Sequence, residues 1–179
     1  MKYIIFLSIG FLLGSSSIYA QEHHMSGHDE HEHMVGEMEP ESGFGICPVM
    51  REPASEEYHH EYKGKTYYFC CPMCIEKFKQ NPGEYISKIK EVSLEIYQFG
   101  YEPDTIVVKK GDIVKLLASS RDVTHGVYIK DYGINVPVKK GEIKKIEFIA
   151  DKIGEFPILC SVYCGRGHHS MKAKLIVEE

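Results

Sequence analysis

The sequence of 179 residues has no tryptophan, no excess of basic residues and no long hydrophobic run after its first 13 residues. Lys and Arg number 21 against 26 Asp and Glu, for a net charge of −5, which argues against nucleic-acid binding because phosphate binding requires a basic stripe. Without a later run of about 20 apolar residues, the mature chain has no membrane span. What the sequence does contain is 10 His, 7 Met and 6 Cys, the side chains that ligate soft and borderline metals.

The N-terminal segment predicts export. Lys2 precedes an apolar run from Tyr3 to Leu13, and small polar residues lead from there to Ala20. This is the order of a secretory signal peptide, and the run is too short for a membrane-spanning helix of about 20 residues. We therefore expect residues 1–20 to be cleaved off and the protein to be periplasmic or otherwise exported. The alternative is an uncleaved N-terminal anchor.

Residues 21–42 are expected to be a disordered His/Met-rich segment with almost nothing to bury. Seven acidic residues surround His23, His24, Met25, His28, His31, His33, Met34 and Met38. Imidazole and thioether groups are copper ligands, and carboxylates add electrostatic attraction. The segment therefore predicts loose copper capture, with a solubilising tail as the alternative.

Four cysteines mark residues 43–90, namely Cys47, Cys70, Cys71 and Cys74. We expect a short strand over residues 67–69 and a helix that begins near Pro72 and ends at residues 81–83. Three of the thiols then lie at a strand-to-helix junction, where a helix N-terminus lowers the pKa of a thiol. Cys47, on a turn before Pro48, can return to the same point.

This segment allows more than one chemistry. Cysteines of an exported chain pair as disulfides by default, and four could form two bridges. Cys71-Pro72-Met73-Cys74 is also typical of a thioredoxin-like redox pair, but the βαβ unit of that fold does not fit between Gly43 and Tyr67. A c-type haem site is excluded because Ile75 stands where His is required.

Residues 43–90 resemble the YHS/TRASH family of small metal-binding domains. The matching features are Cys47, a gap of 22 residues, the Cys70-x-x-x-Cys74 pair, and the aromatic and Asn-Pro positions around it. The resemblance implies a thiolate site for copper or zinc with Cys47, Cys70 and Cys74 as ligands. His59 or His60 could be a further ligand, and Cys71 stands where that family often has serine.

From Glu91 onward the sequence changes to short, alternating strands separated by turns with Gly and Lys. The expected strands cover residues 92–98, 106–108, 113–116, 127–129, 143–148, 156–158 and 175–177. Some seven strands at this spacing predict that residues 91–179 form an antiparallel β-sandwich. The whole chain is thus expected to be mainly β, with a small Cys-rich α+β domain ahead of the sandwich.

The metal-ligating residues of this half lie in one loop before the last strand. Cys160, Cys164, His168 and Met171 follow one another at spacings of four, four and three. Two thiols, an imidazole and a thioether make a compact copper ligand set, and the end of a sandwich can fix its geometry. His125, at the start of another strand, would complete the set. The alternative is a Cys160–Cys164 disulfide with incidental His and Met.

The presence of two cysteines favours two copper ions. One Cys with two His and one Met would make a mononuclear blue-copper site. Two thiolates can instead bridge two ions, which leaves His125 and His168 as one terminal imidazole each. Met171 and a loop carbonyl then supply one weak ligand apiece.

From roughly Tyr97 to Val177 the chain resembles the CuA cupredoxin family, which includes cytochrome c oxidase subunit II and the copper domain of nitrous oxide reductase. The resemblance implies that Cys160 and Cys164 bridge the ions, that His125 and His168 are terminal ligands, that Met171 is a weak ligand and that Val162 offers its backbone carbonyl. The chain departs from subunit II in two respects. It lacks the N-terminal membrane hairpin, and residues 98–101 (Gln-Phe-Gly-Tyr) replace a Trp-rich patch that accepts electrons from cytochrome c.

A binuclear site that shares one electron between two coppers leaves no open position for a substrate. This half should therefore catalyse no bond-making reaction by itself. We predict one-electron transfer between an exported donor such as a c-type cytochrome and a respiratory oxidase or reductase. The alternatives are a copper chaperone or scavenger that serves a periplasmic metalloenzyme, and an oxidase subunit without its anchor.

Overall fold

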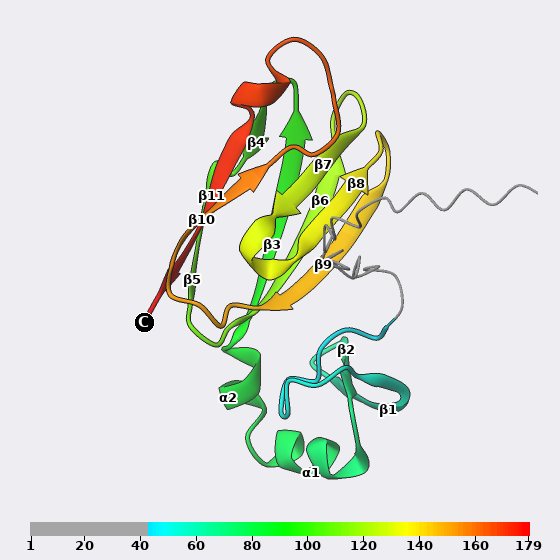
Figure 1. The fold of residues 1–179 in the computed structure, drawn as a ribbon. Coiled ribbons are helices and arrows are strands. Elements are labelled where there is room, and N and C mark those ends of the chain that lie inside the picture. The colour runs from blue at the N-terminus through cyan, green and yellow to red at the C-terminus, as the bar shows by residue number, and fades with distance from the viewer. Residues whose placement is uncertain (1–42) are drawn as a thin grey trace, which may run out of the picture. The chain divides into compact units, whose positions relative to one another are not determined.

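The computed structural model describes residues 43–179 (Figure 1). The expected signal peptide (residues 1–20) and the His/Met-rich segment (residues 21–42) lie outside the described residues. Within the described part, no helix combines the length and the apolar character that a membrane crossing demands. Its buried apolar side chains form two separate clusters, one in the Cys-rich segment and one in the strand-rich segment that follows.

The Cys-rich segment folds as a two-stranded antiparallel hairpin followed by two short helices (Figure 1). These elements are β1 (Ser55–Tyr62), β2 (Lys65–Phe69), α1 (Pro72–Gln80) and α2 (Pro82–Ile86). The strand expected over residues 67–69 is confirmed as part of β2, and the helix expected from Pro72 is confirmed as α1. Pro72 suits the start of a helix because the N–H group that proline lacks has no hydrogen-bond partner in a first turn. The prediction missed β1, since its sequence SEEYHHEY has no apolar alternation.

Phe78 lies at the centre of the small core of this segment. Its side chain has no exposed surface, and rings from both strands and from α2 pack around it. The ring centroids of Tyr67 and Phe69 lie 5.0 and 5.2 Å from that of Phe78, and those of Tyr62 and Tyr85 lie 5.9 and 6.2 Å away. Aromatic packing therefore supplies most of the burial in a core too small for many aliphatic residues.

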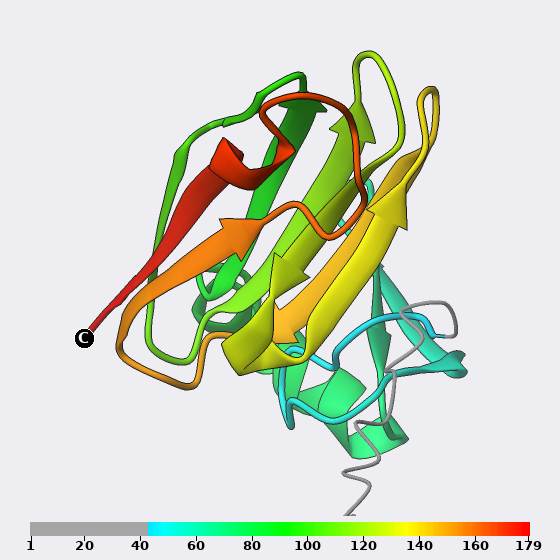
Figure 2. The same cartoon turned by 45° about the horizontal axis from the view of Figure 1, so that its top comes forward.

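The strand-rich segment is a β-sandwich (Figures 1 and 2). Its strands are β3 (Ile89–Tyr97), β4 (Gly100–Glu102), β5 (Thr105–Lys109), β6 (Ile113–Ser120), β7 (His125–Ile129), β8 (Ile134–Val138), β9 (Ile143–Ile149), β10 (Gly154–Leu159) and β11 (Lys172–Glu178), with two short 3₁₀ helices at Lys130–Tyr132 and His168–Ser170. One sheet has the order β4-β3-β6-β9 and the other the order β5-β11-β10-β7-β8. Alternating side chains of the two sheets meet in one buried core.

All seven expected strands are present, and the β-sandwich is confirmed. Its expected purely antiparallel pairing is wrong at two places, because β3 pairs with β6 and β5 pairs with β11 in parallel. Between β3 and β6 the chain forms β5 in the other sheet. It therefore returns to the first sheet with β6 running in the same direction as β3. The boundary expected between residues 90 and 91 falls inside β3, which begins at Ile89.

Glu147 of β9 is a charged residue held almost entirely out of water, with 8% of its side chain exposed. Its Oε1 atom lies 2.7 Å from Nζ of Lys145 and 3.0 Å from Nζ of Lys115, and its Oε2 accepts a hydrogen bond of 2.9 Å from the backbone N–H of Ile46. Burial alone would raise the pKa of this carboxyl. The two ammonium groups and the Ile46 amide outweigh burial and hold the pKa below its usual range.

Replacing Glu147 with Gln should lower the free energy of unfolding at pH 7 by about 2 kcal/mol, since charge-assisted hydrogen bonds are lost. The pKa of Glu147 is lower in the folded than in the unfolded chain. Its stabilisation is therefore complete above the unfolded pKa of about 4.3 and is lost as the pH falls through the folded pKa. Urea unfolding at pH 7 and at steps below pH 4 should show the difference between wild type and variant shrinking in acid.

Glu155→Gln is the matched control, because the Glu155–Lys174 ion pair is exposed. That variant should unfold like the wild type at every pH. A Glu147→Gln deficit that stays constant down to pH 2 would contradict a role for the ionised carboxylate.

Candidate metal centres

The first candidate centre lies at one end of the sandwich, where the loop between β10 and β11 meets the start of β7 (Figure 2). Gly165 and Gly167 take positive φ angles of 119° and 96°, which fold this loop back over the end of the sheets. His125 is the first residue of β7, and its imidazole is completely buried. His125 thus meets the loop that begins at Cys160, although the two residues are 35 positions apart in the sequence.

The six residues predicted as copper ligands are placed together. The two thiols of Cys160 and Cys164 and a ring nitrogen of His125 all lie within 4.8 Å of one another. Two further pairs complete the arrangement, with His168 Nδ1 3.6 Å from Cys164 Sγ and Met171 Sδ 3.2 Å from the same sulfur. The carbonyl oxygen of Val162 lies 3.1 Å from Cys160 Sγ.

Asp122 orients the buried histidine. Its Oδ1 atom lies 2.7 Å from Nε2 of His125, while Nδ1 of that ring faces Cys160 Sγ at 3.9 Å. Asp122 also accepts hydrogen bonds of 2.7 Å from the backbone N–H groups of Gln98 and Val123. Burial would raise the pKa of Asp122, but these hydrogen bonds outweigh it and lower the pKa. The carboxylate thereby keeps the proton on Nε2 and leaves Nδ1 free to bind a metal.

Backbone atoms of Gly126 support the thiol side of the centre. Its N–H donates to Cys160 Sγ at 3.3 Å, and its carbonyl accepts a hydrogen bond of 2.8 Å from the hydroxyl of Tyr101. A Cβ atom at this position would lie 2.8 Å from the backbone nitrogen of Ser161, so only glycine fits. No supporting role for Gly126, Tyr101 or Asp122 in this centre was predicted from the sequence. Only the spacing of Asp122 three residues before His125 was a usable signal.

The electrostatics of the two thiols fit a bound cation. Burial, and to a smaller degree the neighbouring Cys160, raise the pKa of the Cys164 thiol to about 11. Two thiolates side by side therefore need positive charge between them. Two thiols, two imidazoles, a thioether and a carbonyl, without a carboxylate among the converging atoms, are a donor set that suits copper rather than a hard cation.

Replacing Asp122 with Asn should lower the affinity of the loop for copper about 10- to 100-fold, because a neutral amide no longer fixes the protonated Nε2 of His125. Titration against a copper chelator of known affinity measures this change. Asp131→Asn, at an exposed site in the 3₁₀ helix Lys130–Tyr132, is the matched control and should bind as the wild type does. Equal affinity in both variants would show that Asp122 does not position His125.

The second candidate centre is a group of three thiols in the Cys-rich segment. Sγ atoms of Cys47, Cys70 and Cys74 all lie within 4.8 Å of one another. They come from the turn before β1, the end of β2 and the first turn of α1. Burial would raise the pKa of Cys47, but backbone N–H groups of Met50, Cys70 and Val49 outweigh it, and the pKa is lowered. This trithiol cluster suits a soft or borderline ion such as copper or zinc.

Other residues considered for this centre are not brought into the trithiol cluster. Cys71 Sγ lies 3.4 Å from Cys74 Sγ but outside the group of three. The Nδ1–H of His59 donates to the carbonyl of Glu56 at 3.1 Å, and the ring of His60 packs against Phe78. All six cysteines of the chain are free thiols, so neither the two bridges given as an alternative for the Cys-rich segment nor a Cys160–Cys164 bridge is present.

Comparisons with known proteins found relatives that cover about half of this chain or less. Cytochrome c oxidase subunit 2 of Thermus thermophilus is 36% identical over 83 residues, which cover 46% of this chain and 62% of the relative. Nitrous-oxide reductase of Ralstonia nicotianae is 40% identical over 75 residues, which cover 40% of this chain and 12% of the relative. The crystal structure of the periplasmic domain of cytochrome oxidase subunit II of Bradyrhizobium japonicum, 18% identical, covers 50% of this chain and 84% of that domain with a TM-score of 0.47.

The chain covers less than two thirds of the length of these two curated relatives. Their match confirms the resemblance to oxidase subunit II and nitrous oxide reductase that the loop motif predicted. The family model of the YHS domain matches residues 48–88, and that of the cupredoxin-like domain matches residues 75–177. Because the second match extends over more than half of the chain, this protein belongs to the cupredoxin-like domain family and carries a YHS domain in its N-terminal half.

Proposed function

We propose that residues 91–179 hold a binuclear copper centre of the CuA type and transfer single electrons to or from a respiratory oxidase or reductase. The observation that carries this proposal is the convergence of Cys160, Cys164 and His125 within 4.8 Å. The similarity of the chain to cytochrome c oxidase subunit 2 and nitrous-oxide reductase supports it.

The donor atoms divide naturally between two ions. His125 Nδ1 lies 3.9 Å from Cys160 Sγ, and His168 Nδ1 lies 3.6 Å from Cys164 Sγ, so the two thiolates and the two imidazoles would together hold a pair of copper ions. Met171 and the Val162 carbonyl, which lie 3.2 and 3.1 Å from these sulfurs, would be the weak ligands. When bound, the copper pair supplies a redox centre whose added charge is spread over two ions.

The protein contributes rigidity and exclusion of water. Cys160, Cys164, Met171 and His125 are all buried, and Asp122 and the Gly126 amide fix the orientation of His125 and Cys160. A preorganised, dry site needs little rearrangement when its charge changes, which favours fast electron transfer. With every position taken by a protein ligand, we propose that this half performs no substrate chemistry of its own.

Electrons would reach the surface through His168. Its ring is half-buried, and it contacts the rings of His169 and Tyr163 at centroid distances of 5.0 and 5.7 Å. Tyr163 is 74% exposed, and His169 is exposed as well. These two side chains offer the contact for a redox partner, which we propose is a c-type cytochrome or a copper-dependent respiratory enzyme.

Export and copper supply belong to the same proposal. We infer that residues 1–20 direct the chain to the periplasm or another exported location, and that residues 21–42 collect copper loosely. The YHS domain would then bind a further copper or zinc ion through Cys47, Cys70 and Cys74.

A copper chaperone or scavenger is the second candidate function, and the trithiol cluster is the observation that favours it. Three thiolates form a closed site for one soft ion and no redox centre. In this version the YHS domain would deliver copper to a metalloenzyme, and the sandwich would serve as a second carrier. A combined role is also consistent with the geometry, with one half acquiring copper and the other using it.

Electron paramagnetic resonance and visible spectroscopy of residues 21–179, reconstituted with copper, test the proposal. Hyperfine splitting shared over two equivalent copper nuclei, with intense thiolate charge-transfer bands, is the expected result. Splitting from a single nucleus, or silent Cu(I) bound only through the Cys-rich half, would overturn the electron-transfer proposal and favour the carrier.

A further inference from the structure

Cys71 is the one cysteine that neither candidate centre uses, and it lies against a ligand of the trithiol cluster. Its Sγ atom is 3.4 Å from Cys74 Sγ, closer than the 3.6 Å between Cys70 and Cys74. Cys71 is the N-cap of α1, and the N–H of Cys74 donates to its carbonyl at 3.1 Å. The first turn of the helix thus fixes the two residues relative to each other.

This placement meets the geometric requirement for a disulfide. Residues three apart in a helix have Cα atoms about 5 Å apart, inside the range of about 4.4 to 6.8 Å that disulfides span. Cys70, by contrast, directly follows the last residue of β2 and precedes the turn of α1. Its own ligand role in the trithiol cluster holds it towards Cys47 as well as Cys74.

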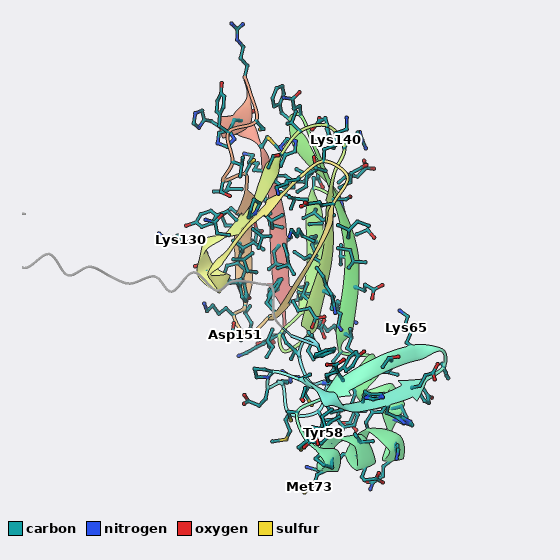
Figure 3. All side chains as sticks on the ribbon, turned by 90° about the vertical axis from the view of Figure 1, so that its right-hand side faces the viewer. Tyr58, Lys65, Met73, Lys130, Lys140 and Asp151 are labelled. Carbon is teal, nitrogen blue, oxygen red and sulfur yellow. The ribbon has the colours of Figure 1, made fainter. Side chains whose placement is uncertain are left out.

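The pair is also within reach of solvent. The side chains of Cys71 and Cys70 are half-buried, whereas those of Cys47 and Cys74 are buried. Met73, between the two cysteines of the pair, is 70% exposed on the outer side of α1 (Figure 3). Of the pair, Cys71 is therefore the thiol that a small reagent reaches, and Cys74 reacts second.

We propose that Cys71 and Cys74 form a reversible disulfide that closes the trithiol cluster to metal. The proposal rests on the metal site proposed above, since Cys74 cannot be a thiolate ligand and a disulfide partner at once. The oxidant is a low-molecular-weight disulfide such as oxidised glutathione. The Cys71 thiolate attacks one of its sulfurs and expels one thiolate, and the Cys74 thiolate then attacks the Cys71 sulfur and expels the second. Two electrons pass to the oxidant, and the two cysteines lose their two protons.

Peptide mapping tests the bond itself. Metal-free, reduced residues 21–179 are incubated with oxidised glutathione, labelled with N-ethylmaleimide and digested with trypsin. Cys70, Cys71 and Cys74 all lie in one tryptic peptide, Thr66 to Lys77. The expected peptide carries one label, on Cys70. Apart from that label, its mass is lower than that of the reduced peptide by two hydrogen atoms, which the Cys71–Cys74 disulfide removes.

Two serine variants identify the partners. Cys71→Ser should give a peptide with two labels and no disulfide under the same oxidant. Cys70→Ser should still form the disulfide and carry no label. A Cys70–Cys74 bond in the wild type, or three labels on its peptide after oxidation, would overturn the proposal.

Zinc release tests the consequence, in a Cys160→Ser, Cys164→Ser background that removes the thiols of the other centre. Zinc is chosen because it undergoes no redox chemistry. Oxidised glutathione should release one equivalent of zinc, detected with a chromogenic chelator, and Cys71→Ser should bind one equivalent and keep it. Loss of zinc binding in reduced Cys71→Ser would make Cys71 a ligand and overturn the switch. If the reduced Cys160→Ser, Cys164→Ser protein bound no zinc, the proposed metal site would be refuted. Peptide mapping would still test whether the Cys71–Cys74 disulfide forms.

Discussion

Replacing Cys160 and Cys164 together with serine should abolish copper binding in the loop between β10 and β11 and remove its thiolate charge-transfer bands. Serine hydroxyls do not ionise near neutral pH and are hard donors, so His125, His168 and Met171 are left without the two thiolate charges that the proposed copper pair requires. Serine is close to cysteine in size, so the sandwich should still fold. Copper stoichiometry and the visible spectrum measure the result, which should be loss of two coppers per chain.

The trithiol cluster provides the matched control for this variant. Replacing Cys47 and Cys70 with serine should remove one ion from the Cys-rich half and leave the visible bands of the sandwich intact. Loss of metal from both halves in either double variant would refute two independent centres.

Replacing Phe78 with alanine should unfold the Cys-rich half while the sandwich remains folded. Phe78 is completely buried, and its ring is the common neighbour of Tyr67 and Phe69 in a core whose only other fully buried members, among the described residues, are Cys47 and Cys74. Removing a buried phenyl ring costs about 3 to 5 kcal/mol, and a core this small has little stability to spare. Thiol-reagent kinetics should show Cys47, Cys70 and Cys74 becoming fully reactive, while the copper bands of the other centre persist.

Met73→Ala, on the exposed side of the same helix, is the control for Phe78→Ala. It should leave the thiols of the trithiol cluster protected and the unfolding temperature close to that of the wild type. If Phe78→Ala also abolished the copper bands, the two hydrophobic clusters would not unfold separately.

Much of the copper loop could be predicted because its ligands are local in sequence. Cys160 to Met171 fall within a single loop, and the alternating strands on either side already indicate that it lies at one end of a sandwich. His125 could be added because it begins a strand and because the pattern resembles a known family. Predicting this loop therefore required only the chemistry of the side chains, their spacing, and the alternation of apolar and polar residues in the flanking strands.

The parts that were missed depend on contacts between segments far apart in the chain. β1 is polar along its length and is a strand only because β2 pairs with it, while β4 has three residues and β8 contains a proline. The two parallel pairs follow from crossings between the sheets, which no local pattern encodes.

The sequence by itself determined the kinds of ligand and their local order, since these depend on side-chain chemistry and short spacings. Only the tertiary structure decided which atoms converge. It placed Asp122 behind His125 and the amide of Gly126 on Cys160, and it left Cys71 beside the trithiol cluster rather than in it. The physical reason is that the donor atoms of a metal centre must lie within a few ångströms of one another. Between segments far apart in the sequence, such distances are set by the packing of the whole fold.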